Sequence, residues 1–555
     1  MYIILCMEYK IKYVGSNLRT DWSIYYNATM ETISKEYFYT LIGISDFDPI
    51  DACLFNLDIF TYTDKVHILH SSIRCVPNIP CILYGNRARP DDERLPDFVI
   101  ESAECSIPEY VIISYKDWEP HSSPSAHIVK RIGVIQEPRH FYEYYLYSKS
   151  LQFSPTINTK HLFSQILSVK SYKIEDRTRE YVITIDPKKS KDFDDGMAFQ
   201  QLNKTSRFTI YISNVALWID FLNLWEALSY RMRNIHLPDR KRPLMPFVLS
   251  DGLFSLKQNE LRIALAIDMY ITDGEIKSVV YKNALIRVSR NYHYNEEGLN
   301  DDPIYNDVFK LITVLFKQRT FKNIDYMRDS HDMICYIMLL ANTTIAREFI
   351  KYECGLFRSE NPVPSMTAIG EKMREEHSLR FRKLIYNWNM AGSCFRPYKE
   401  RVKHSLLKLE HYIQVTSPIR RLVDLLNMMM FQISSKWIRR GFMSNAFMDY
   451  WMTQVEYINQ TLRSVRRVQN SIHIIERYRE IPNDKSFRGY MFDIITRNDG
   501  LHQYMVYLEE LNVLARYLSN VKRNEYETGM FRIYICRNPV NGRDKIMVSD
   551  ASKFC

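Results

Sequence analysis

A predicted strand that ends in a cluster of aspartates is the feature that most constrains this chain. The apolar run Tyr181–Ile185 predicts a β-strand, and Asp186 follows it directly. Asp192, Asp194 and Asp195 lie within the next nine residues. Carboxylates this close repel one another unless a hard cation neutralises them, and Mg²⁺ prefers oxygen ligands. The run therefore predicts a divalent metal site suited to phosphodiester hydrolysis, with an acidic surface loop as the alternative.

A second motif, Thr416-Ser417-Pro418-Ile419-Arg420-Arg421, predicts the start of a helix. Serine and proline are common at the first positions of helices. Two arginines in a first helical turn are unusual, because cations are unfavourable there unless an anion is bound. We expect that anion to be a phosphate.

The positive charge of the chain is concentrated in one region. The formal net charge is +9, and residues 415–480 contain ten basic residues against five acidic ones. Nucleic acid is the natural partner of such a surface, and a solvated helix face is the alternative.

The pattern of the 555 residues predicts three regions. Residues 1–170 show short alternating runs typical of small β-barrels. A mixed region follows, with a strand at Phe208–Val215 and helices at Trp225–Met232, Met333–Lys351, Arg420–Arg440 and Ala446–Tyr478, the last long enough to contain a break. Strands return after residue 484, so we expect a third barrel.

Composition excludes several classes of protein. The ten cysteines include no C-x-x-C pair, which indicates a reducing compartment rather than a disulfide framework. The longest uncharged run near the middle, Ile334–Ala346, is too short to cross a bilayer. Met1–Met7 reads as a first strand rather than a signal peptide. We expect a cytoplasmic monomer with no membrane partner and no small-molecule cofactor; association with an organelle or a virion stays open.

Both motifs resemble signatures of the ribonuclease II (RNB) superfamily of 3′→5′ exoribonucleases. Ile185-Asp186-Pro187 with Asp192, Asp194 and Asp195 matches the family's I-D-P-x-x-x-x-D-x-D-D sequence, and the second motif matches T-S-P-I-R-R. Further blocks follow in the family's order: Leu237-Pro238-Asp239-Arg240, Pro243–Pro246, Leu249–Leu256, Met338–Asn342 and His404–Tyr412.

The resemblance implies an α+β catalytic body flanked by small OB-type barrels, two of them N-terminal and cold-shock-like and one C-terminal. The expected domains are 1–92 and 93–170 for the N-terminal barrels, 171–482 for the RNB body and 483–555 for the last barrel.

The resemblance also implies a reaction, the Mg²⁺-dependent hydrolysis of single-stranded RNA to nucleoside 5′-monophosphates. Asp186, Asp192, Asp194 and Asp195 would hold Mg²⁺, with Mn²⁺ as an alternative, and Asp194 and Asp195 would also be catalytic. Arg420 would contact the scissile phosphate, and Tyr294 would lie near the leaving nucleotide. The residues expected to bind RNA are His236, Arg231, Arg240, Arg421 and Arg358.

The chain departs from the family at several positions. Asn214 stands where the family has an acid near the metal, and Cys335 and Tyr336 replace a pair of glutamates. His236 replaces the tyrosine that reads the 2′-hydroxyl, so selectivity for RNA over DNA is open. An RNA-binding pseudo-nuclease is therefore the alternative function, and a DNA nuclease is a third.

Overall fold

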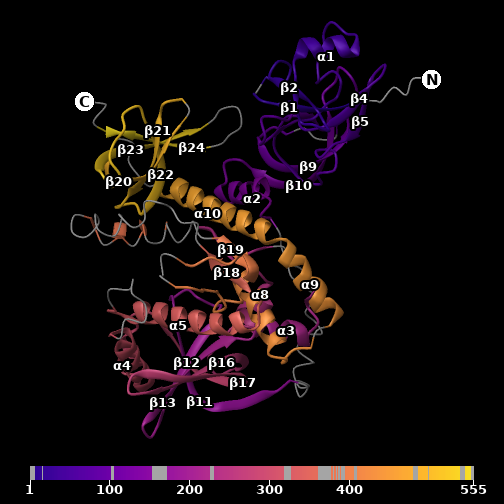
Figure 1. The fold of residues 1–555 in the computed structure, drawn as a ribbon. Helices are drawn as coiled ribbons and strands as arrows, with labels where there is room; N and C mark the ends of the chain where they lie inside the picture. Colours follow the sequence, from indigo (N-terminus) through magenta and orange to yellow (C-terminus); the bar gives the residue numbers. More distant parts are fainter. Residues whose placement is uncertain are drawn as a thin grey trace. The chain divides into compact units, whose positions relative to one another are not determined.

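The computed structural model describes residues 7–551 except 16, 102–104, 153–171, 226–230, 318–326, 360–376, 379, 383, 386–387, 389–393, 405–408, 440, 479–484, 498 and 538–543. Most of the strand predicted at Met1–Met7 and most of the helix predicted at Trp225–Met232 lie outside these residues. The chain divides into two compact units, one of Met1–Gln152 with Asn470–Cys555 and the other of Phe153–Gln469. Figure 1 labels their elements.

The first region of the chain is a five-stranded sheet with one helix. The strands follow the order β3-β2-β1-β4-β5. Alternate residues of the first strand, Tyr9, Ile11 and Tyr13, are buried, as expected for a sheet with one covered face. The elements are β1 (Glu8–Tyr13), β2 (Trp22–Tyr26), β3 (Thr32–Ile33), α1 (Lys35–Ile42), β4 (Ile59–Tyr62) and β5 (Val66–His70).

The second region is a closed barrel followed by a helix. Its elements are β6 (Ile79–Tyr84), β7 (Arg87–Pro90), β8 (Phe98–Val99), β9 (Glu109–Asp117), β10 (Ser125–Val134) and α2 (Pro138–Ser148). A domain boundary at residue 92 is wrong, because β7 and β8 on either side of it pair through Arg87 with Val99 and Ala88 with Phe98. We propose that the boundary lies between β5 and β6.

The last region is a closed barrel with the order β20-β21-β22-β24-β23. Its strands are β20 (Phe487–Thr496), β21 (His502–Leu508), β22 (Val513–Ser519), β23 (Thr528–Arg537) and β24 (Asp544–Asp550). The predicted α+β fold class is confirmed, with small closed barrels in the second and last regions. The first region was expected to be a barrel, but its described strands form a sheet whose edge strands β3 and β5 do not pair with each other.

The second unit is built on a closed barrel of long strands. Phe208, Ile210 and Ile212 share one face of β13, as predicted, and pack in the main core with the helices. The other face of the same strand places Tyr211 against Val182 and small alanines. Both faces of β13 are therefore buried. The strands are β11 (Ile174–Asp186), β12 (Asp195–Leu202), β13 (Thr205–Ser213), β16 (Leu261–Thr272) and β17 (Glu275–His293).

Helices and two short hairpins complete this unit. The predicted long helix breaks at Gln454, between α9 and α10. The helices are α3 (Val215–Phe221), α4 (Pro303–Lys317), α5 (Ser330–Lys351), α8 (Leu422–Ser434), α9 (Phe442–Thr453) and α10 (Val455–Tyr478), with the short η3 (Val248–Leu253), η4 (Glu297–Leu299) and η5 (Tyr398–Glu400). The residues of α10 from Asn470 onward belong to the first unit. The hairpins are β14 (Ile235–His236) with β15 (Lys241–Arg242), and β18 (Leu356–Ser359) with β19 (Cys394–Pro397).

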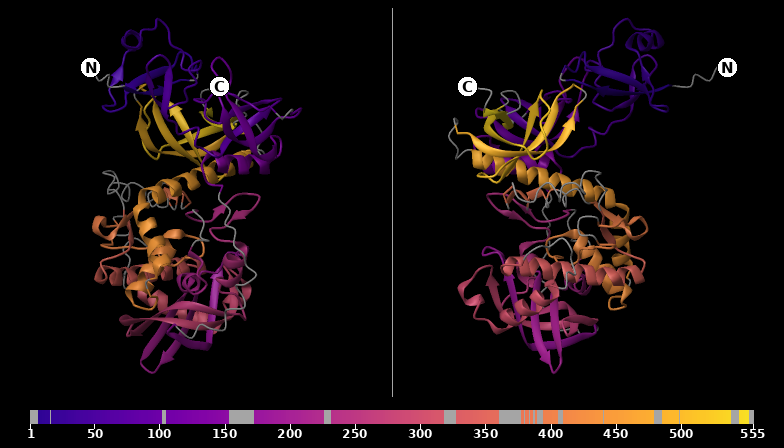
Figure 2. Two further views of the ribbon diagram at one scale, coloured as in Figure 1. Left: turned by 90° about the vertical axis from the view of Figure 1, so that its right-hand side faces the viewer. Right: turned by 60° about the vertical axis from the view of Figure 1, so that its left-hand side comes forward.

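α5 shares the main core of the unit with the barrel. It lies beside the barrel in all three views of Figures 1 and 2. By length and composition alone it could cross a membrane, yet 61% of its most apolar window is buried inside the structure. Its apolar side chains, Met333, Ile337 and Ile345 among them, pack into the main core.

Candidate active site

The aspartate cluster lies where two paired strands meet. β11 ends at Asp186, β12 begins at Asp195, and the strands pair through Ile183 and Met197. Gly196 permits this close approach, because a Cβ there would lie 3.2 Å from the carbonyl oxygen of Ile183. The strand pairing therefore brings both ends of the Asp186–Asp195 loop together.

The second motif docks onto this loop through Asp194. The Asp194 carboxylate is 1% exposed and accepts hydrogen bonds from the Ile419 backbone N–H at 2.9 Å and from Arg420 Nε at 2.7 Å. Arg420 also donates to Ser417 Oγ at 3.2 Å. The two motifs predicted to act together therefore form one site.

The local structure of the second motif differs from the prediction. α8 begins at Leu422, and Pro418–Arg420 form a turn before it. Ser417 does not cap the helix; its Oγ accepts from Arg420 and Arg421, and its backbone N–H donates to Asp424 at 2.9 Å. The turn aims Arg420 at the aspartate loop, whereas a helical first turn was expected.

Asp192 is engaged by two residues that the sequence analysis missed. Its two oxygens accept from Asn234 Nδ2 and from Lys241 Nζ, each at 2.9 Å. Lys241 also binds Asp251 at 2.8 Å. The only available signal was the basic run Arg240-Lys241-Arg242, which reads equally well as a surface segment.

Asp186 and Asp195 are the carboxylates left for a cation. Asp186 Oδ2 is buried and has no hydrogen-bond partner among the described residues. Burial, followed by the charge of Asp195, raises the pKa of Asp186, and burial raises the pKa of Asp195 as well. Burial also raises the pKa of Asp194 to about 7 against the opposing effect of Arg420. An orphaned carboxylate oxygen in such a site fits a hard divalent ion.

Tyr294 and His236 lie at this site. The Tyr294 backbone N–H donates to the Asp186 carbonyl at 3.0 Å, and its ring packs edge-on against His331, with centroids 5.2 Å apart. Burial, followed by the charges of Asp195 and Asp186, raises the pKa of Tyr294. His236 lies on β14 with part of its surface exposed. Desolvation of the covered part of the ring lowers its pKa, while the charge of Asp192 opposes the shift.

Arginines gather beside the second motif. Burial, followed by the charges of Arg421, Arg466 and Arg420, lowers the pKa of Arg233 to about 10. Burial, followed by the charge of Arg358, lowers the pKa of Arg466. We call Arg233, Arg421 and Arg466 the arginine cluster. Arg421 is paired with Asp424 at 2.7 Å, and the mutual repulsion of the three guanidinium groups favours a bound polyanion.

Two other arginines expected to bind RNA differ in exposure. The Arg240 side chain is 64% exposed. Arg231 is 5% exposed and donates to the Pro243 carbonyl at 2.7 Å, a position that suits a structural role better than contact with RNA.

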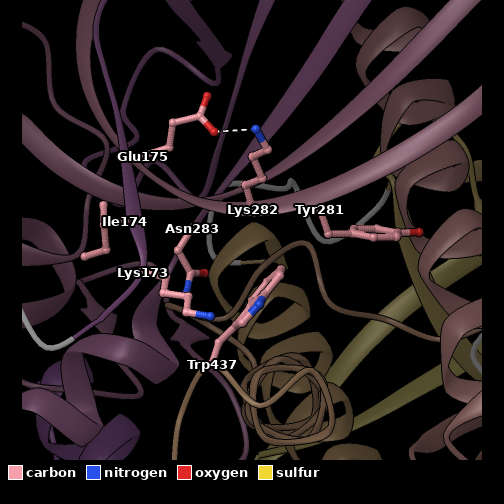
Figure 3. A pocket seen from close by; sticks show the side chains of 7 residues that line it. All are labelled: Lys173, Ile174, Glu175, Tyr281, Lys282, Asn283 and Trp437. Atoms are coloured by element: carbon pink, nitrogen blue, oxygen red, sulfur yellow. Dashed lines mark hydrogen bonds and ion pairs between the residues drawn. The ribbon is translucent and has the colours of Figure 1, made fainter.

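Asn214 belongs to a buried amide network. It caps α3 by accepting from Leu217 N–H, and its Nδ2 donates to Asn283 Oδ1 at 2.8 Å. Asn283 exchanges hydrogen bonds with Gln432 and lines an open pocket of about 350 Å³ beside Trp437 (Figure 3). An aspartate at this position would place a charge in a network of neutral amides.

The other departures lie on α5. Tyr336 is 1% exposed and belongs to the core, whereas Cys335 is exposed, with its Sγ 3.8 Å from His331 Nδ1. Asp329, His331 and Asp332 place ligand atoms within 4.8 Å of one another. Asp329 already caps α5 by accepting from the Asp332 N–H at 2.8 Å, so this group is engaged in holding the helix start.

Comparison with known proteins finds a domain match in the second unit. Residues 174–298 match the RNB domain. Ribonuclease R of Aquifex aeolicus is 25% identical over 320 residues, which cover 45% of this chain and 45% of that protein. The chain spans about half the length of the curated relatives that it matches.

Two solved structures have a similar fold. Mycoplasma genitalium RNase R, solved in complex with ribose methylated single-stranded RNA, has a TM-score of 0.68 at 14% identity, over 98% of this chain and 100% of that one. Yeast Ssd1, described as a pseudonuclease, has a TM-score of 0.57 at 16% identity, over 82% of this chain and 66% of that one. The two motifs join in one site, and residues 174–298, which carry the aspartate loop, match the RNB domain.

Proposed function

We propose that the chain is a divalent-metal-dependent 3′→5′ exoribonuclease that hydrolyses single-stranded RNA to nucleoside 5′-monophosphates. The observation that carries the proposal is the placement of Arg420 on Asp194, beside the Asp186 and Asp195 carboxylates. An anionic group that can hold a metal and a fixed guanidinium are the two elements needed to bind a phosphodiester and stabilise charge that develops on it.

Asp186 and Asp195 would hold the ion, which we expect to be Mg²⁺, with Mn²⁺ as an alternative. Such an ion lowers the pKa of a bound water and neutralises charge on phosphate oxygens. Asp192 and Asp194 are tied to Lys241 and Arg420, so they would orient the loop and these cations.

Arg420 would act on the scissile phosphate. Asp194 and Ser417 fix the guanidinium, yet 47% of the side chain stays exposed and available to substrate. A donor that is already oriented costs no reorganisation when charge develops on the phosphate.

The arginine cluster would bind the phosphates upstream of the cleaved bond, and Tyr294 would stack on the leaving nucleotide. Stacking on aromatic rings and contacts to backbone phosphates bind single strands without reading sequence. The complex of M. genitalium RNase R with single-stranded RNA supports RNA as the substrate class.

The test is degradation of a 5′-labelled single-stranded RNA and its DNA counterpart, with Mg²⁺ or EDTA. The wild type is expected to give a ladder that shortens from the 3′ end, lost in EDTA and in Asp195→Asn. Asp176→Asn, an exposed carboxylate on the same strand β11, is the matched control and should degrade RNA like the wild type. Shortening of the DNA as well would show that His236 does not select for the 2′-hydroxyl.

The second candidate is an RNA-binding pseudo-nuclease. Asn214 favours it, because this chain has a neutral amide where the family has an acid near the metal. RNA binding without any shortening, in Mg²⁺ and in Mn²⁺, would establish this function and exclude the nuclease.

A further inference from the structure

The Lys241 ammonium group lies between two carboxylates of the candidate active site, a position typical of a bound metal ion. Its Nζ lies between two carboxylates, 2.9 Å from Asp192 Oδ1 and 2.8 Å from Asp251 Oδ1. The three side chains are 17%, 9% and 15% exposed.

The same segment reaches Arg420. Asn234 donates through Nδ2 to the second oxygen of Asp192, and its backbone N–H donates to the Arg420 carbonyl at 3.0 Å. Asn234 Oδ1 in turn accepts from the Leu244 N–H at 2.6 Å. Asp192 is thus held on both oxygens by a segment that also fixes the turn carrying Arg420.

We propose that Lys241 is a positioning residue that stands in for a second metal ion, so that the site binds one divalent ion through Asp186 and Asp195. The inference rests on the proposed function. Ammonium and a divalent ion compete for the same carboxylate oxygens, and an intramolecular ammonium needs no ion from solution. With Arg420 on Asp194, two of the four aspartates are neutralised by the chain itself.

The test counts bound Mn²⁺ by electron paramagnetic resonance in the absence of RNA. The wild type is expected to bind one ion at this site. Lys241→Ala is expected to bind a second, more weakly, because Asp192 and Asp251 are released. Ethylammonium should displace that second ion, and Lys241→Ala/Asp192→Asn should not bind it. Lys277→Ala, which removes an exposed lysine paired with Glu275, is the control and should keep the wild-type count.

Two results would overturn the proposal: two ions at this site in the wild type, or one ion in a folded Lys241→Ala protein. The wild-type count does not require any variant to fold. The count is also independent of turnover, so a chain that fails to degrade RNA would sink the proposed function while the ion count still decides the role of Lys241.

Discussion

Asp194 Oδ2 lies 2.7 Å from Arg420 Nε, although 226 residues separate them in the sequence. The carboxylate is 1% exposed and the guanidinium 47%, so the acid is buried and the cation faces the site. Removing the cation from such a pair leaves an uncompensated buried charge. The contact therefore links the integrity of the site to the group that would act on the phosphate.

Arg420→Met is expected to lower the rate of RNA hydrolysis by about 10²–10³-fold, because a preorganised donor to the developing charge is lost. Single-turnover degradation of a labelled RNA measures this effect. Arg179→Met, at an exposed arginine on β11, should hydrolyse RNA like the wild type. Equal rates for both variants would remove Arg420 from the mechanism.

Metal is expected to stabilise the protein more at pH 8 than at pH 6. The pKa of Asp194 is raised to about 7, and those of Asp186 and Asp195 are also raised by burial. A carboxyl group whose pKa is raised in the folded protein contributes its full stability at a pH below the pKa of the unfolded chain, about 3.9. This stability is lost as the pH rises through the pKa of the folded protein, because the buried group then becomes charged. The metal-free site is therefore destabilised at pH 8, where an ion would bind the ionised carboxylates.

Differential scanning fluorimetry with Mg²⁺ or EDTA at both pH values measures this effect. Asp186→Asn should lose the pH-dependent part of the Mg²⁺ shift, while Asp176→Asn should keep it. Identical Mg²⁺ shifts at pH 6 and pH 8 would contradict the assignment of these carboxylates to the metal site.

The barrel contains a buried ion pair whose loss should destabilise the second unit. Arg177 donates to both oxygens of Asp268, at 2.7 and 2.6 Å, and the side chains are 2% and 1% exposed. Arg177→Met is expected to cost about 3–5 kcal/mol in the free energy of unfolding, because Asp268 is left charged and buried. Arg177→Met/Asp268→Leu should recover much of this loss in denaturant unfolding. A double variant less stable than the single one would show that packing, not charge, dominates.

The parts of this molecule that depend on local sequence could be predicted. The strand before Asp186, the alternation of Phe208, Ile210 and Ile212, and the break between α9 and α10 follow from periodicity and length. The aspartate cluster could be predicted for the same reason, since its four residues are neighbours in the sequence.

Features that depend on distant contacts could not be predicted. Lys241 meets Asp192 across 49 residues, and in the sequence it is one of three consecutive basic residues. Ser417 and Pro418 have the composition of a helix start, yet docking of the Ile419 N–H onto Asp194 makes them a turn. The domain boundary predicted at residue 92 is wrong, because β7 pairs with β8 and so belongs to the second region.

Arg233 is expected to lower the stability of the RNA-free protein and to raise its affinity for RNA. Its Nε is buried and has no hydrogen-bond partner among the described residues. Burial, followed by the charges of Arg421, Arg466 and Arg420, lowers its pKa to about 10. Arg233→Met is therefore expected to raise the melting temperature of the RNA-free protein, since like-charge repulsion is relieved. The same variant should bind single-stranded RNA more weakly. A plot of the logarithm of its association constant for RNA against the logarithm of the salt concentration should be less steep by about 1. Arg179→Met, at an exposed arginine on β11, should change neither property. An Arg233→Met protein that melts at a lower temperature and binds RNA as tightly as the wild type would show that Arg233 is a structural residue rather than a phosphate ligand.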